Sequence, residues 1–233
     1  MRYLGGKTQI ARELAKEINT YRGNLPFLDP FCGSLAMAKA LGGFGFVSDI
    51  HPALIALYQS IAAGWLPPET FSREEWEHAQ NLPDHNPLKG FAGFGCSFRG
   101  MYFQGYAGGF VGPVSNFGAQ AARQVLLRDV LILKDRGVEF KCQNFFDIEP
   151  HPNVFLYLDP PYKGVTGYKG TPKFPYHQFV ERVQQWSRFT PICVSEYQFP
   201  LGRVVWEKSR ARKLIAGSGK RAIERLYLIE SGK

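Results

Sequence analysis

The sequence predicts an α/β protein with an open parallel sheet, built as one domain or as one domain that carries an insertion. Strand-like and helical segments alternate over residues 1–65, which is the order expected of parallel strands joined by crossover helices. The chain has 233 residues, of which 45% are hydrophobic, and this is enough to bury the core of such a domain. It has no apolar run long enough to predict a membrane-spanning helix.

The first part of the chain predicts two strands and three helices. The strands are expected at residues 26–29 and 43–49, and the helices at residues 7–19, 34–41 and 52–63. Ile10, Leu14 and Ile18 recur at helical spacing, which supports the first helix. Pro52 stands where the last of the three begins, and proline is well tolerated in a first helical turn.

The middle of the chain interrupts this alternation. Ser72 and Glu75 have the spacing of a capping box, which predicts a short helix after Ser72. Residues 86–117 are rich in glycine and aromatic residues and show no sustained period, so we expect loops and short strands there. We therefore expect an inserted recognition region at residues 66–136, within a domain formed by residues 1–65 and 137–233.

The last part of the chain returns to strands and helices. Strands are predicted at residues 138–141, 154–158 and 191–195, and helices at residues 119–136 and 176–188. Phe179, Val183 and Trp186 share one face of the last helix. Two further strand candidates, residues 202–207 and 225–230, flank a basic stretch at residues 208–220.

The composition favours an intracellular protein with a polyanionic partner. The net charge is +8 and the isoelectric point is about 9.3, which suits nucleic acid first, although a basic soluble enzyme would have the same balance. The four cysteines lie far apart without a CxxC pair, which predicts reduced thiols and neither a disulfide framework nor a zinc site. The histidines have no metal-ligand spacing, and the N-terminus has no apolar core of a secretory signal, so a cytoplasmic location is expected.

Three acids, Asp29, Asp49 and Asp159, stand where predicted strands end, and ligands of open α/β sheets bind at that edge. After Asp29, the segment DPFCGS turns around Gly33 and leaves backbone N–H groups free for a ligand. Asp49 ends the second strand, where a carboxylate can accept hydrogen bonds from ribose hydroxyls. An ordinary strand-to-helix loop would also explain this pair of features.

The segment DPPY, from Asp159 to Tyr162, ends an apolar strand in an unusual way. Each proline has a fixed φ and no N–H group, so carbonyl groups near Asp159 stay available. A carboxylate beside a free carbonyl can accept two hydrogen bonds from one amino group, and the Tyr162 ring can stack on the ring that carries it. The segment therefore favours a clamp for a planar ring with an exocyclic amino group. The alternative is a strand that ends in proline beside an incidental tyrosine.

Four short segments follow one another along the chain: RYLGGK at 2–7, DPFCGS at 29–34, SDIHP at 48–52 and DPPY at 159–162. In order and approximate spacing they resemble the motifs of the Dam-type (class alpha, D12) DNA adenine-N6 methyltransferases. The segments SFRGMYFQGYA, SEY and ERLYL are further similar to phage-type members. The resemblance implies a Rossmann-like S-adenosylmethionine-dependent methyltransferase sheet, with the inserted region at residues 66–136 serving target recognition.

The resemblance also implies a binding site for S-adenosylmethionine. It is implied to contain Tyr3, Lys7, Asp29, Phe31, Gly33, Asp49, Ile50, Asn144, Phe145 and Asp159. There, Asp29 faces the ammonium group of the methionine end, Asp49 holds the ribose and Ile50 packs on the cofactor adenine.

The sequence departs from the family pattern at two positions. Asn144 precedes Phe145 where an Asp-Phe pair is usual, with Asp147 as a rival for that role. Leu35 occupies a position where a second glycine is usual. Leu35 either marks the start of a helix or crowds the methionine end of the cofactor.

The implied reaction is methyl transfer to N6 of an adenine flipped out of double-stranded DNA, with no metal involved. Asp159 and the Pro160 carbonyl would hold the amino group, and Tyr162 would stack on the base. DNA contacts are expected from Arg99, Tyr102, Gln104, Lys163, Tyr168 and Lys169, and from the basic run at residues 208–221. The alternatives are a cytosine-N4 methyltransferase, in which serine is commoner in place of Asp159, and a catalytically silent DNA-binding protein of the same fold.

Overall fold

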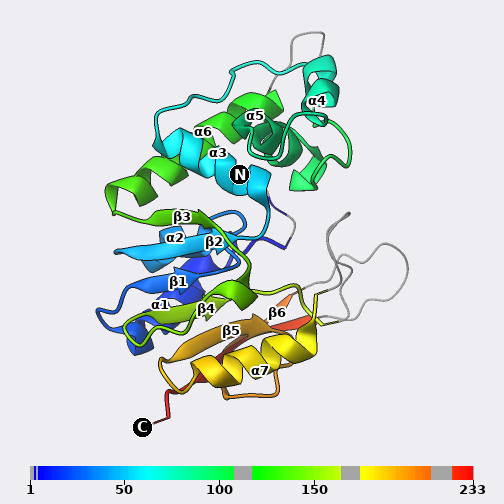
Figure 1. The fold of residues 1–233 in the computed structure, drawn as a ribbon. Coiled ribbons are helices and arrows are strands. Elements are labelled where there is room, and N and C mark those ends of the chain that lie inside the picture. Colours follow the sequence, from blue (N-terminus) through cyan, green and yellow to red (C-terminus); the bar gives the residue numbers. More distant parts are fainter. Residues whose placement is uncertain (1–2, 4, 108–116, 164–173, 211–221, 233) are drawn as a thin grey trace.

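The computed structural model describes residue 3 and residues 5–107, 117–163, 174–210 and 222–232, and these form one seven-stranded sheet (Figure 1). Its strands are β1 (Phe27–Asp29), β2 (Gly45–Asp49), β3 (Glu139–Cys142), β4 (Phe155–Leu158), β5 (Ile192–Glu196), β6 (Arg203–Arg210) and β7 (Ala222–Ile229). The strand order is β3-β2-β1-β4-β5-β7-β6, with β1 to β5 parallel and β7 antiparallel between β5 and β6. The Rossmann-like α/β fold predicted from the sequence is confirmed.

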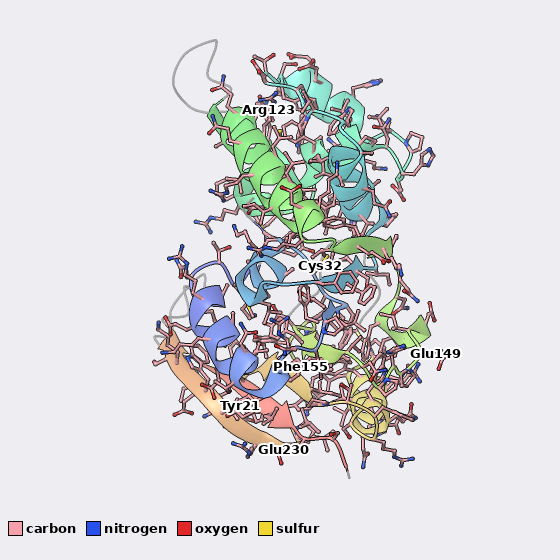
Figure 2. The ribbon with its side chains drawn as sticks, turned by 90° about the vertical axis from the view of Figure 1, so that its left-hand side faces the viewer. Tyr21, Cys32, Arg123, Glu149, Phe155 and Glu230 are labelled. Carbon is pink, nitrogen blue, oxygen red and sulfur yellow. The ribbon has the colours of Figure 1, made fainter. Side chains whose placement is uncertain are left out.

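Helices cover both faces of this sheet. They are α1 (Ala11–Arg22), α2 (Ala36–Leu41), α3 (Pro52–Ala62), α4 (Arg73–Ala79), α5 (Pro87–Gly90), α6 (Phe117–Asp135) and α7 (Tyr176–Trp186). Helices α1, α2, α3 and α6 share one hydrophobic cluster, whereas α7 packs into a second cluster on the opposite face. Figure 2 shows Phe155 between α1 and α7, where the sheet separates the two layers.

The alternation of side chains along the strands explains the two layers. In β1 and β4, Phe27 and Phe155 enter the cluster of α1, while Leu28 and Leu156 enter the cluster of α7. Successive strand residues point to opposite faces, so strands covered on both sides are apolar throughout. All four residues of β4 are buried, which fits the uninterrupted apolar run that precedes Asp159.

Residues 87–100 of the inserted region are largely helical where loops and short strands were expected, so the prediction was wrong for this stretch. Residues 87–100 form α5, a π-helical turn (Phe91–Gly95) and a 3-10 turn (Phe98–Gly100). Glycine serves close packing here: a Cβ atom on Gly90 would lie 2.1 Å from the carbonyl oxygen of Ala53 in α3. Gly90 therefore lets α5 approach α3, a use of glycine that period and composition do not reveal.

The capping box at Ser72 is present and begins α4 as predicted. The indole of Trp76 then donates hydrogen bonds to the Ala92 carbonyl (3.1 Å) and the Ser97 hydroxyl (3.0 Å). Trp76 and Phe91 belong to the same buried cluster as α1 to α3. The inserted region thus extends the core of the sheet domain, beyond the β3 edge in Figure 1.

The two last strands are longer than expected and form a hairpin-like antiparallel pair. β6 takes in residues 208–210 of the predicted basic stretch, and residues 211–221 lie outside the described part of the chain. All four cysteines are free, with Cys32, Cys96 and Cys193 buried and Cys142 exposed. Among the helices described, none has the length and apolar character needed to cross a bilayer.

Candidate active site

The acids predicted at strand ends meet along one edge of the sheet. Asp29 and Asp49 are the last residues of β1 and β2, and Asp159 follows β4 directly. Because β1, β2 and β4 are parallel neighbours, their carboxyl ends converge, and all three acids line one large cleft. Residues of the inserted region, among them Phe94 and Tyr102, line the same cleft.

The turn after β1 is tied to the end of β2. One carboxylate oxygen of Asp49 accepts a hydrogen bond from the Gly33 amide (3.2 Å), and the other accepts from the His51 amide (3.0 Å). Gly33 has a positive φ of 40°, and a Cβ atom there would lie 2.9 Å from the Tyr3 ring. Glycine is therefore required both by the backbone and by the closeness of Tyr3.

Burial raises the pKa values of Asp29 and Asp49. It raises the pKa of Asp49 to about 6, against the opposing effect of the His51 and Gly33 amides. The pKa of Asp29 is raised well above its usual range, first by burial and then by the negative charge of Asp159. Asp29 also accepts a hydrogen bond from the Phe31 amide (3.2 Å). A cationic group bound beside Asp29 would favour its ionised form.

The structure decides between the two roles considered for Leu35. Leu35 lies at the N-terminal boundary of α2 with a φ of 64°, in the left-handed region that favours glycine. Its side chain is 1% exposed and packs in the core, and Leu35 itself does not line the cleft. Leu35 therefore marks the start of the helix and does not project into the cleft.

We expect Leu35→Gly to lower the free energy of unfolding, although glycine suits the backbone better. Relief of the left-handed conformation is worth about 1–2 kcal/mol, whereas emptying a buried leucine site costs about 2–5 kcal/mol. Urea denaturation should show a net loss of roughly 1–3 kcal/mol. An increase in stability would contradict this account of Leu35.

The segment before β4 places Asn144 and Phe145 in the cleft. The Asn144 side-chain oxygen accepts a hydrogen bond from the Phe146 amide (3.2 Å) and so caps the 3-10 turn Phe145–Asp147. Phe145 is buried against Phe31, with ring centroids 5.4 Å apart. The rival residue, Asp147, is exposed and outside the cleft lining formed by the described residues. Ile50, which is 56% exposed, lines the cleft as well.

Asp159 belongs to a group of four interacting residues, which we call the acidic corner: Lys7, Asp159, Tyr162 and Glu224. The Lys7 ammonium lies 2.6 Å from Asp159 Oδ1 and 3.2 Å from Glu224 Oε1, and it is only 5% exposed. The Tyr162 hydroxyl donates a hydrogen bond to the same Glu224 oxygen. Lys7 also lies over the Tyr162 ring, 4.7 Å from its centroid.

Charges within the acidic corner set its protonation. Burial raises the pKa of Asp159, and the neighbouring Lys7 ammonium opposes this rise. Burial alone would lower the pKa of Lys7, but the charges of Asp159 and Glu224 outweigh it, so the Lys7 pKa is raised. Lys7 is thus held as a cation directly beside Asp159. The sequence predicted a role for Lys7 at the cofactor and did not predict this ion pair.

A further acid, Glu196, lies at the end of β5 and fixes the chain after Tyr162. It accepts hydrogen bonds from the backbone amides of Lys163 (3.1 Å) and Tyr197 (2.8 Å). Burial raises the pKa of Glu196 to about 7. The Tyr197 ring in turn packs edge-on against Tyr162, with centroids 4.7 Å apart.

The residues predicted to contact DNA are placed in different ways. Arg99 and Lys163 are exposed and line the cleft, while Gln104 is exposed outside it. Tyr102 is half-buried between His51 (centroid distance 4.3 Å) and Phe94 (4.8 Å), and burial raises its pKa to about 12. Tyr102 therefore packs the inserted region against the turn after Asp49. Tyr168 and Lys169 lie outside the described residues.

Glu196 and Glu224 lie in the SEY and ERLYL segments and were not predicted to be site residues. Glu196 could have been found, because it directly follows a predicted strand, as Asp159 does. Glu224 lies on the same face of β7 as the buried residues Leu226 and Leu228. Because acids are seldom buried without a partner, an acid at such a position indicates a functional or paired residue. The contact between Lys7 and Asp159 spans most of the chain and has no local signal.

Comparison with known proteins supports the resemblance read from the motifs. The model of the D12 class N6 adenine-specific DNA methyltransferases matches residues 3–89. This range contains most of the RYLGGK segment and all of the DPFCGS and SDIHP segments, whereas DPPY lies beyond it. No curated protein matches the sequence.

Two solved structures are similar to this chain at low identity and low TM-score. The rRNA methyltransferase aviRa from Streptomyces viridochromogenes is 14% identical with a TM-score of 0.42, over 95% of this chain and 84% of that chain. SMU.472, described as a methyltransferase and complexed with SAH, is 14% identical with a TM-score of 0.39, over 98% of this chain and 54% of that chain. The family match to residues 3–89 confirms that the chain resembles the D12 class N6 adenine-specific DNA methyltransferases.

Proposed function

We propose that the protein transfers the methyl group of S-adenosylmethionine to N6 of an adenine in DNA. The observation that carries this proposal is the position of Asp159, which lines the same cleft as Asp29 and Asp49 and is followed by two prolines. The D12 family match over residues 3–89 supports both the cofactor and the target atom. The net charge of +8 suits a DNA partner.

The cofactor fits the part of the cleft formed by the ends of β1 and β2. Asp29 would face the ammonium group of the methionine end, and Asp49 would accept hydrogen bonds from the ribose hydroxyls. The exposed side chain of Ile50 offers an apolar surface for the cofactor adenine. Gly33 keeps the backbone free of side-chain atoms beside the Tyr3 ring.

The target base fits beside Asp159. The Asp159 carboxylate and the Pro160 carbonyl would accept hydrogen bonds from the two N6 hydrogens, which turns the nitrogen lone pair toward the methyl carbon. Bound S-adenosylmethionine would supply an electrophilic methyl group, so that the N–C bond would form as the C–S bond breaks, with the bonding electrons left on sulfur and the positive charge passed to N6. The methylated nitrogen would then lose one proton to solvent water. No covalent enzyme intermediate is needed, so positioning and electrostatics carry the catalysis.

The DNA duplex would reach this corner with one adenine flipped out of the stack, at a cost of a few kcal/mol. Tyr162 would offer its ring to the flipped base, while its hydroxyl stays bound to Glu224. Arg99 and Lys163 line the cleft and would contact the DNA backbone or base edges. The inserted region would then read the target site, since it forms the wall that faces the sheet edge.

Cofactor affinity should rise with pH, because Asp29 has a raised pKa in the free protein. Asp29 must lose its proton to pair with the methionine ammonium group, so binding should release protons and strengthen as Asp29 ionises. Calorimetry of S-adenosylmethionine binding in buffers of different ionisation enthalpy measures this release. The Asp29→Asn variant should bind weakly and lose this part of the pH dependence. An unchanged proton release in Asp29→Asn would contradict the role of Asp29.

The direct test of the proposed function is methylation of plasmid DNA by the purified protein, followed by single-molecule sequencing and mass spectrometry of the nucleosides. We expect N6-methyladenine at a short recurrent site. N4-methylcytosine would instead show that the clamp holds a cytosine. Cofactor binding without any methylated nucleoside in DNA would rule the proposed function out, and absence of cofactor binding would favour a silent DNA-binding protein.

A further inference from the structure

The acidic corner contains an acid from the far end of the chain that the motif segments at residues 2–52 and 159–162 do not include. Glu224 belongs to β7, and only 4% of it is exposed. It meets Lys7 at 3.2 Å and accepts the hydrogen bond of the Tyr162 hydroxyl. One carboxylate thus contacts both the cation that binds Asp159 and the ring that would stack on the target base.

The charge of this group depends on Glu224. Lys7 contributes one positive charge, and Asp159 and Glu224 contribute one negative charge each, so the ionised corner carries a net charge of about −1. Without Glu224, Lys7 would neutralise Asp159 completely. With Glu224, the ammonium charge is shared between two carboxylates, and Asp159 keeps more of its strength as a hydrogen-bond acceptor.

This sharing matters because of where charge develops in the reaction. The amino nitrogen gains positive charge as it attacks the methyl carbon, and it does so within hydrogen-bond reach of Asp159. A preorganised negative charge in a site with little water stabilises that transition state more than the uncharged amino group of the ground state. A neutral Lys7–Asp159 pair would give much less of this stabilisation.

Glu224 also fixes the geometry. Lys7 engages Asp159 through Oδ1, and the Tyr162 hydroxyl also interacts with the Asp159 carboxyl. Because Glu224 takes a second hydrogen bond from the Lys7 ammonium, the ammonium cannot turn toward Oδ2 without losing a buried contact. The same carboxylate binds the Tyr162 hydroxyl and so fixes the orientation of the Tyr162 ring, which contacts Lys7 and Tyr197.

We propose that Glu224 is a positioning residue of the methyltransferase site. It shares the positive charge of Lys7, so that Lys7 does not fully neutralise Asp159, and it orients Tyr162. The inference rests on the proposed function and deepens it. It makes the last antiparallel strand of the sheet part of the catalytic apparatus. Glu224 itself touches neither the base nor the cofactor; it acts through Lys7 and Tyr162.

The test is Glu224→Gln, which keeps the shape and an oxygen that can accept from Tyr162 but removes the charge. We expect kcat to fall roughly tenfold to a hundredfold, with KM for S-adenosylmethionine nearly unchanged. Glu224→Asp, which keeps the charge, should retain more kcat than Glu224→Gln. Glu207→Gln is the matched control, since Glu207 pairs with Arg225 on the exposed side of β6 and should leave kcat unchanged. Equal kcat in wild type and Glu224→Gln would overturn the inference.

A second measurement is independent of catalysis. Selective carbon-13 labelling of aspartate allows the Asp159 carboxyl to be titrated by NMR in the whole protein. Removing the Glu224 charge should lower the Asp159 pKa, because Glu224 repels the Asp159 carboxylate and competes for Lys7. An unshifted Asp159 titration would overturn the inference even if the wild type methylates DNA. If the wild type does not methylate DNA, the proposed function fails, while a shifted titration still shows the coupling.

Discussion

Asp159→Ala should abolish methyl transfer while the protein still binds S-adenosylmethionine. Asp159 is the group that would accept a hydrogen bond from the target amino nitrogen, and no neighbouring side chain of the acidic corner can replace it. Lys7 is a donor, and Glu224 is already engaged by Lys7 and Tyr162. Loss of one preorganised group at the reacting atom costs roughly a hundredfold to a thousandfold in rate, and Asp159 supplies both charge and orientation. We therefore expect a fall in kcat of at least about a thousandfold.

The fold and the cofactor site should survive this change. In Asp159→Ala, the Lys7 ammonium keeps its ion pair with Glu224, so no unpaired charge is left buried. The negative charge of Asp159 is one cause of the raised Asp29 pKa, so its removal favours ionised Asp29 at the methionine end. Binding of S-adenosylmethionine by calorimetry should therefore remain close to wild type.

The matched control is Asp147→Ala, because Asp147 is an exposed acid outside the cleft. It should retain full methyl transfer, measured as radiolabelled methyl incorporated into DNA. Substantial activity in Asp159→Ala would show that the amino group is held elsewhere. Equal loss in both variants would point to a general effect on the protein.

Lys7→Met should strongly destabilise the protein and also impair methyl transfer. Lys7 is 5% exposed and lies between two carboxylates, so its removal leaves Asp159 and Glu224 facing each other without a cation. Breaking a buried ion pair by removing one partner costs about 3–5 kcal/mol. We expect a loss of this size in the free energy of unfolding, measured by urea denaturation at neutral pH.

Lys7→Met should also change the pH dependence of kcat. Two neighbouring carboxylates without Lys7 cannot both ionise easily, so the Asp159 pKa should rise further. Since ionised Asp159 is the better acceptor, kcat should be lowest at acidic pH and recover in part as pH increases. A pH profile of kcat that matches wild type would contradict the contact between Lys7 and Asp159.

A second lysine–glutamate pair provides the comparison for stability. Lys208 and Glu13 also form an ion pair, at 2.5 Å, but their side chains are 45% and 46% exposed. Lys208→Met should cost only about 0–1 kcal/mol, as expected of exposed ion pairs. Similar losses in Lys7→Met and Lys208→Met would mean that burial of the acidic corner does not govern its energetics.

The parallel part of the fold could be predicted because its signals are local. Apolar strands that end in Asp29, Asp49 and Asp159, separated by helices of regular period, determine both the order of elements and the edge where the acids meet. The motif segments then indicate what those acids would bind. The second and third of these segments, and most of the first, lie within the part of the chain that the family model matches.

Other features depend on tertiary packing and were beyond sequence reasoning. The inserted region looked irregular because some of its glycines serve close contacts, as Gly90 does against Ala53, while others, such as Gly105, have a positive φ. Leu35 looked like a defect in the cofactor loop, but the core accommodates its side chain and tolerates its left-handed backbone. The placement of β7 between β5 and β6 brings Glu224 to Lys7, across more than two hundred residues of sequence.

The most direct test is a structure of the protein with S-adenosylhomocysteine and a DNA duplex that carries its methylation site. We predict an adenine extruded from the duplex, with N6 hydrogen-bonded to the Asp159 carboxylate and the Pro160 carbonyl and directed at the cofactor sulfur. Lys7 should remain on Asp159 Oδ1. A target base still stacked in the duplex, or an adenine bound away from Asp159, would contradict the account.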